Sequence, residues 1–165
     1  MSNNISNKTN SLINSIKNGN NNKTLKLIEK GDNVNLEDEN GNTPLIIAIK
    51  VNNIDICKLL IEKGADINLQ NRDGETPLIT AVDSESINIC ELLIEKGADV
   101  NLGDGNGFSP LIIAVMGKSK EICKLLIENG ADINIQGKTG VTALSLAKGN
   151  KDIIKILDSS SSIKK

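Results

Sequence analysis

One string of thirteen residues recurs three times in this chain, each copy 33 residues after the last. It reads "ICKLLIEKGADIN" at 56–68, "ICELLIEKGADVN" at 89–101 and "ICKLLIENGADIN" at 122–134. A period of about 20 to 50 residues is typical of a solenoid, in which each unit packs only against its neighbours. The sequence therefore predicts a row of similar units and argues against segments wrapped around one centre.

Each unit contains two short stretches with apolar residues at helical spacing. In residues 43–51, Thr43 can cap a helix that begins at Pro44, where the missing N–H costs nothing. In residues 54–64, the apolar spacing continues up to Gly64, which is expected to end the helix in a left-handed conformation. The stretch after it is rich in Asn, Asp and Gly, as turns are. Each unit is therefore predicted to be helix, turn, helix and extended loop.

These units resemble the ankyrin repeat. "DENGNTPLIIAI", "NRDGETPLITAV" and "DGNGFSPLIIAV" match the opening of that repeat, and "LLIEKGADIN" matches its second helix and the following turn. The resemblance implies an all-α fold, an α-solenoid of stacked helix-turn-helix ankyrin repeats with β-hairpin-like loops at right angles to the helices. It divides one domain of about five units as follows: an N-terminal capping repeat with a frayed start (1–37), three regular repeats (38–70, 71–103 and 104–136), a C-terminal capping repeat (137–158) and a disordered tail (159–165).

The chain departs from the family pattern at two places. Where the family usually has His after Thr-Pro-Leu, isoleucine stands at Ile46, Ile79 and Ile112, which predicts apolar burial in place of a polar network. The turn between the two helices usually carries Gly, but Glu85 and Lys118 stand there in the third and fourth units. A non-glycine residue at positive φ costs about 1 kcal/mol, so we expect these two turns to rearrange.

Two sets of repeated polar or reactive residues have a structural interpretation. We expect the asparagines that recur in register to bond the backbone of neighbouring loops: Asn35, Asn68, Asn101 and Asn134. Three cysteines share one position of the second helix: Cys57, Cys90 and Cys123. Packed helices lie about 8–10 Å apart and a disulfide needs α-carbons within about 7 Å, so adjacent cysteines should not bridge. We predict that they are small buried apolar residues.

Composition limits the remaining chemistry. The chain has no His, so no Ser-His or Cys-His pair is available, and we predict no metal, no cofactor and no catalytic residue. The net charge is −2 and Phe108 is the only aromatic residue, which argues against nucleic acid as a partner. We see neither a signal peptide nor an apolar run of about 20 residues, so we expect no membrane contact and a cytoplasmic monomer, with delivery into a host cell left open.

The resemblance implies that partners are gripped by the loop tips and the exposed side of the first helices, which line a concave face. The corresponding positions are Glu39, Asn42, Lys50, Arg72, Asp73, Glu75, Asp83, Asn106, Phe108, Met116, Lys138 and Val141. The fourth unit differs because apolar residues, Phe108 and Met116, stand at outward positions there. Either Phe108 anchors a partner or it folds back onto its own hairpin; we favour the anchor.

These observations predict a non-enzymatic protein–protein interaction module whose partner the sequence does not identify. The alternative is a small-molecule or enzymatic role at the acidic third repeat, around Asp73, Glu75 and Asp83. That role would need a deep pocket, which a solenoid of neighbour contacts rarely closes.

Overall fold

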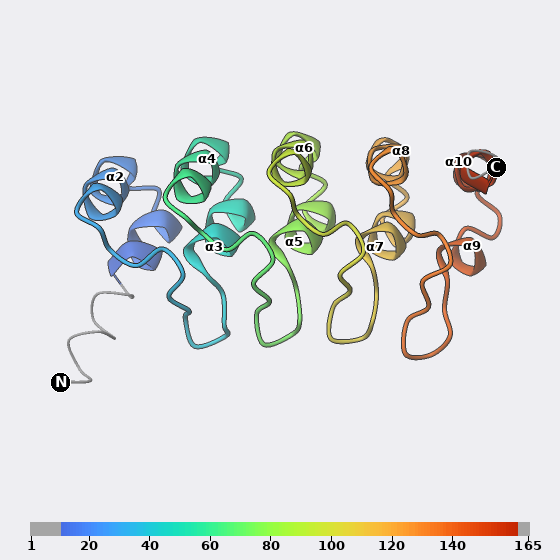
Figure 1. The fold of residues 1–165 in the computed structure, drawn as a ribbon, viewed down its shortest axis with the longest axis horizontal. Helices are drawn as coiled ribbons and strands as arrows, with labels where there is room; N and C mark the ends of the chain where they lie inside the picture. The colour runs from blue at the N-terminus through green and yellow to red at the C-terminus, as the bar shows by residue number, and fades with distance from the viewer. Residues whose placement is uncertain (1–10, 162–165) are drawn as a thin grey trace.

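The computed structural model describes residues 11–161 as a row of helix pairs. The first helices of the units form one row, the second helices form another, and long loops project from the side of the first row (Figure 1). The described residues are helical, turn or irregular, and none is in a strand. This is the all-α solenoid that the 33-residue period predicts.

The helices are short, and until the last unit the first helix of a pair has seven residues and the second has nine. The first helices of the units span 11–17, α3 (Pro44–Lys50), α5 (Pro77–Asp83), α7 (Pro110–Met116) and α9 (Ala143–Leu146). The second helices are α2 (Asn21–Glu29), α4 (Ile54–Glu62), α6 (Ile87–Glu95), α8 (Lys120–Glu128) and α10 (Lys151–Ser161). Helices of this length are marginal alone, so their stability comes from packing.

Local sequence fixes where the helices begin and end. The hydroxyl of Thr43 accepts a hydrogen bond from the backbone N–H of Ile46 at 3.2 Å, and Pro44 follows at the first helical position, as predicted. The same cap recurs at Thr76 and, with serine, at Ser109. At the other end of the pair, Gly64 has a φ of 85°, which confirms the left-handed stop.

The turns between paired helices do not rearrange where glycine is missing. Asn52, Glu85 and Lys118 have φ values of 53°, 52° and 58°, close to the 64° of Gly19 at the same position in the first unit. The expectation that the third and fourth units change here is therefore wrong. The flanking helices hold the turn, for example through the hydrogen bond from Ser86 N to Ala81 O, and the strain of about 1 kcal/mol is accepted.

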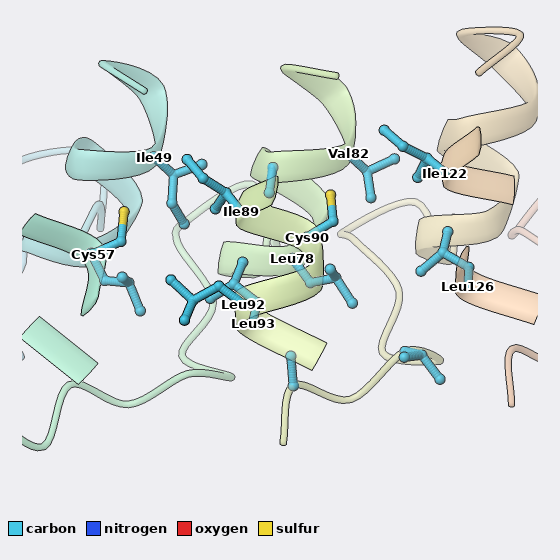
Figure 2. Close-up of a cluster of buried hydrophobic side chains, with 14 of the residues drawn as sticks. Ile49, Cys57, Leu78, Val82, Ile89, Cys90, Leu92, Leu93, Ile122 and Leu126 are labelled. Atoms are coloured by element: carbon cyan, nitrogen blue, oxygen red, sulfur yellow. The ribbon is translucent and has the colours of Figure 1, made fainter. Parts of the chain in front are cut away.

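A single aliphatic core runs the length of the solenoid, from Leu12 to Leu157. The isoleucines that replace the family's His are buried, as predicted: Ile46, Ile79 and Ile112. Figure 2 shows Cys57 and Cys90 on successive second helices among isoleucine and leucine side chains. All three cysteines are buried and free, which confirms that they serve as small apolar residues.

The first unit fills the same space differently. Ser15 and Thr24 stand where the next unit has Ala48 and Cys57. Both side chains are buried, and their hydroxyl oxygens lie 2.9 Å apart, within hydrogen-bond distance of each other. Because each polar group has a partner, the pair is compatible with burial.

The predicted asparagine bonds between units are present. The side-chain oxygens of three asparagines accept from a backbone N–H one unit further on, as Asn35 from Asp66, Asn68 from Asp99 and Asn101 from Asp132. Asn134 instead donates to the Asp132 carboxylate within its own turn.

The two ends of the chain were expected to be irregular. The predicted frayed start, residues 1–10, lies outside the described residues. At the other end the predicted tail is wrong for residues 159–161, because α10 continues to Ser161. Ile153 and Leu157 bury one face of α10, and the Ser159 hydroxyl bonds the Ile156 carbonyl, so the helix can extend past its last apolar contact.

Candidate binding surface

The projecting loops are closed hairpin-like turns, although none is assigned as strand. In the second unit, Asp38 N donates to Asn42 O and Gly41 N donates to Asp38 O. The same two backbone bonds recur in the three following loops, which begin at Asn71, Asp104 and Gly137. Each loop is therefore held by its own backbone before any neighbour is considered.

The first residue of the loop adds a side-chain cap in three of these four turns. The Oδ1 atom of Asp38 accepts from the backbone N–H groups of Asn40 and Asn42, each at 2.9 Å. Asn71 and Asp104 repeat this arrangement in their own loops. Burial opposes ionisation of Asp38, but these N–H groups and the Lys17 ammonium outweigh it and hold the pKa of Asp38 below its ordinary value.

Adjacent loops are joined at their tips by one backbone hydrogen bond per boundary. These bonds run from Arg72 N to Asn40 O, from Gly105 N to Asp73 O and from Lys138 N to Asn106 O. Gly74 permits the approach, because a Cβ there would lie 2.3 Å from Gly105 N, and its φ of 77° is one that L side chains rarely adopt. We call these four loop tips, with the exposed side of the first helices, the loop face.

Most of the predicted partner-binding residues lie exposed on the loop face. Five are at the tips: Glu39, Arg72, Asp73, Asn106 and Lys138. Three are at the C-terminal ends of first helices: Lys50, Asp83 and Met116, the last of which is 52% exposed. Glu75, Phe108 and Val141 are partly buried.

Asn42 is the exception, and its prediction as an exposed contact residue is wrong. Its side chain is only 6% exposed. The side-chain oxygen Oδ1 of Asn42 accepts from the Lys50 ammonium at 3.2 Å and from the Asn71 side-chain amide at 3.1 Å. The Asn42 side-chain amide donates to Asp38. Asn42 is therefore a structural link between two loops.

A polar network occupies the first part of the loop face. Lys17 pairs with Asp38 at 3.2 Å, and one unit further on Lys50 approaches Glu75 at 3.5 Å. Glu75 also accepts from the Asn71 amide at 2.8 Å. These charged groups already have partners within the protein, so each would contribute less binding energy to a partner protein than an unpaired charge would.

Apolar residues replace this network in the fourth unit and in the C-terminal capping repeat. In the positions equivalent to Asn42 and Glu75 stand Phe108 and Val141, and in the position of Lys50 stands Met116. At these two positions the side chains of the loop face change from polar to apolar along the solenoid. Large apolar side chains at a surface are the usual anchors of protein interfaces.

Phe108 packs on the following loop and is partly buried. It lies against the hydrophobic core, and its ring covers Gly137, where an added Cβ would lie 2.4 Å from the ring atom Cε1. Gly137 is the one loop-opening position among the four that lacks a capping Asp or Asn. The ring occupies the space that a capping side chain would need.

Sequence reasoning missed two leucines. Leu144 and Leu146 of α9 are 53% and 40% exposed, and both lie near the C-terminal end of the row. The signal was present in the sequence, because the segment that holds the first helix and the following turn is two residues shorter in the last unit than in the unit before it.

The acidic residues of the third repeat and the three cysteines have simple structural surroundings. Asp73 and Asp83 are exposed, and Glu75 is engaged by Lys50 and Asn71. Burial raises the pKa of the Cys57 and Cys90 thiols to about 12 and that of Cys123 to about 11, so these thiols are poor nucleophiles. Within residues 11–161 no group of three or more Cys, Asp or Glu side chains is placed to hold a metal ion, and no helix is long and apolar enough to cross a membrane.

Stacked helix pairs, capped by Thr-Pro and joined by bonded loops, define the class of helical repeat proteins that present a surface of loops. A sequence profile described as ankyrin repeats in three copies matches residues 12–104 and 99–164. The chain belongs to the ankyrin repeat family. No curated protein matches it significantly. Ankyrin repeats are generally modules that bind other proteins, and the family is generally non-enzymatic.

Proposed function

We propose that this chain is a non-enzymatic binding module that holds a protein partner on its loop face. The observation that carries the proposal is the row of exposed tip residues on loops already bonded to one another. Arg72 and Lys138 donate through their backbones to the preceding loop while their side chains stay exposed. A surface ordered before binding loses little entropy when a partner arrives.

The chemistry of the loop face favours a partner whose surface carries both charge signs and some apolar side chains. Its tips carry both charge signs, as at Arg72 and Asp73, and its fourth unit adds Met116. The small-molecule alternative would place a pocket at Asp73, Glu75 and Asp83, whereas the groove between α4 and α6 and the groove beside α7 are lined by other residues.

Site-specific photo-crosslinking tests the proposal. A photoreactive amino acid would be placed at Asp73 or Asn106 on the tips and, as a matched exposed control, at Lys58 on the second helix α4. We expect the same protein to crosslink from both tips and not from Lys58. Crosslinking from Lys58 alone would move the interface to the other side of the solenoid and refute the proposal.

A charge-reversal pair gives the energetic check. Arg72→Glu with Lys138→Glu should weaken binding of the crosslinked protein by roughly tenfold, since rim charges contribute up to about 1 kcal/mol each. Lys58→Glu should leave the affinity within about twofold of the parent.

A further inference from the structure

A groove of about 810 Å³ lies at the C-terminal end of the solenoid, between the end of α7 and the connection from α9 to α10. Its lining comes from Val115, Met116 and Lys118 on one side and from residues 146–153 on the other. We call it the C-terminal groove. It shares Met116 with the loop face but contains none of the loop tips.

The groove follows from the shortened last unit. From Pro110 to Lys120, the starts of α7 and α8 are ten residues apart, whereas Ala143 and Lys151, the starts of α9 and α10, are eight apart. Helix α9 has four residues where α7 has seven. The final turn of α9 is therefore missing, and the space beside the last turn of α7 that it would fill stays open.

The floor of the C-terminal groove is apolar and accessible. Val115 and Ile153 are buried beneath it, while Met116 is 52% exposed and Leu146 is 40% exposed. Met is a flexible side chain that adapts to different apolar ligands. Two large apolar side chains at one groove give a ligand more contiguous apolar contact area than a single exposed apolar residue would.

The rim of the C-terminal groove is basic. Lys118, Lys148 and Lys151 line it, and none of the three takes part in an ion pair found in the described part of the chain. The acidic residue in the lining, Asp152, is already paired with Lys120. On a chain with a net charge of −2, this groove is a local positive site with an apolar floor.

The acid facing the rim from the preceding unit is Glu85. A Cβ added at Gly117 would lie 3.8 Å from a Glu85 carboxylate oxygen, so this acid lies beside the α7–α8 turn. Glu85 is not among the groove's lining residues, and the three rim lysines outnumber it. The groove therefore still favours a negatively charged ligand over a positively charged one.

We propose that the C-terminal groove binds a short segment of a partner protein in which large apolar side chains are flanked by Asp or Glu. The apolar residues would cover Met116 and Leu146, and the carboxylates would face Lys118 and Lys148. The exposed mouth suits a chain segment better than a small molecule, which needs most of its surface enclosed. Nucleic acid fits less well, because the lining has no aromatic side chain on which a base could stack. The inference extends the proposed function by adding a second contact region and its chemistry.

A defined peptide probe tests this binding directly. The probe is a short fluorescein-labelled peptide in which leucines alternate with glutamates, and two matched peptides carry lysine for glutamate or serine for leucine. Fluorescence anisotropy against the full chain should show binding of the first peptide, with both matched peptides at least tenfold weaker. Equal binding of the three peptides, or no binding of the first, would overturn the proposal.

Variants then locate the probe. The double variant Lys118→Glu with Lys148→Glu should weaken peptide binding by at least tenfold, and Leu146→Ser should weaken it by about threefold to tenfold. An unchanged circular dichroism spectrum is the check on folding. The control is Lys30→Glu with Lys63→Glu, a charge change of the same size at exposed positions beyond α2 and α4. An equal loss in the control would show attraction by net charge alone and overturn the groove assignment.

Two further outcomes also decide against the groove. Loss of the probe only in the Arg72→Glu variant would place the peptide on the loop face, which overturns this inference and leaves the proposed function intact. Displacement of the probe by inorganic phosphate at millimolar concentration, with no effect of Leu146→Ser, would show an anion site without apolar recognition. Crosslinking from the loop tips is independent of all these measurements.

Discussion

Replacing Gly137 by alanine should force the Phe108 ring off the neighbouring loop. The new Cβ would lie 2.4 Å from Cε1 and 2.5 Å from Cδ1 of that ring, well inside the 3.0 Å that real Cβ contacts essentially never cross. Gly137 does not occupy the left-handed region, so alanine itself is not strained there. The ring can escape only by turning toward solvent and losing its packing.

The size of the effect follows from the burial of the ring. Truncating a fully buried Phe costs about 3–5 kcal/mol, and Phe108 is partly buried, so we expect Phe108→Ala to cost about 1.5–2.5 kcal/mol. Gly137→Ala should cost about 1–2 kcal/mol, because it displaces most of the same packing. Once Phe108 is alanine, Gly137→Ala has nothing to displace. The coupling energy between the two positions should therefore be about 1–2 kcal/mol.

A double-mutant cycle in urea, followed by far-ultraviolet circular dichroism, measures this coupling; the chain has no Trp or Tyr for fluorescence. Gly117→Ala is the control, since a Cβ there meets its nearest atom at 3.7 Å, and its effect should add to that of Phe108→Ala. In the Phe108→Ala chain, Gly137→Asp should regain about 1 kcal/mol by capping its loop as Asp104 does. Coupling below about 0.5 kcal/mol would refute the ring's position.

Three further results are expected. Glu85→Gly and Lys118→Gly should each stabilise the chain by about 0.5–1 kcal/mol in urea unfolding, because both residues have positive φ, whereas Ser84→Gly at negative φ should not. Asp38→Ala should cost about 1.5–3 kcal/mol and Asp38→Asn clearly less, since Asn keeps the acceptor for two N–H groups. Because the folded pKa of Asp38 is lowered, its stabilisation is present above the ordinary pKa of 3.8 and is lost as the pH falls through the folded pKa, so the parent and Asp38→Asn should converge in acid unfolding curves. The cysteine thiols, with pKa values of about 11 to 12, should react with a thiol reagent only after unfolding; fast labelling of the folded chain would contradict their burial.

The helical framework could be predicted because its determinants are local and repeated. Thr43 and Pro44 mark the start of a helix by their own chemistry, and Gly64 marks an end. The 33-residue period then fixes which stretches become neighbours. A local rule gave the wrong prediction at Glu85. A positive φ favours glycine, but the two packed helices on either side hold the turn in that conformation even though the residue is glutamate.

The surface could be predicted only in part, because exposure depends on what stands opposite in the next unit. Asn42 occupies a variable position, yet it is buried by partners from its own loop and from Asn71 of the next loop. The position of Phe108 could be found only by considering Gly137 in the following loop. The sequence held a signal, because the chain's only Phe precedes the one loop, among the four described, that lacks a capping Asp or Asn. The C-terminal groove had a signal in the shortened last unit, but its dimensions depend on packing.

Three contacts that cross from one unit to the next have a consequence for how this protein can change. Lys17 with Asp38, Lys50 with Glu75, and Phe108 over Gly137 each match one specific neighbour. The Ala and Cys positions of the three middle units are the same and would tolerate exchanging those units, but the loops would not. A recombination event that shuffled whole units would keep the helical stack and lose these three contacts. The order of the units along the chain is therefore constrained as well as their individual sequences.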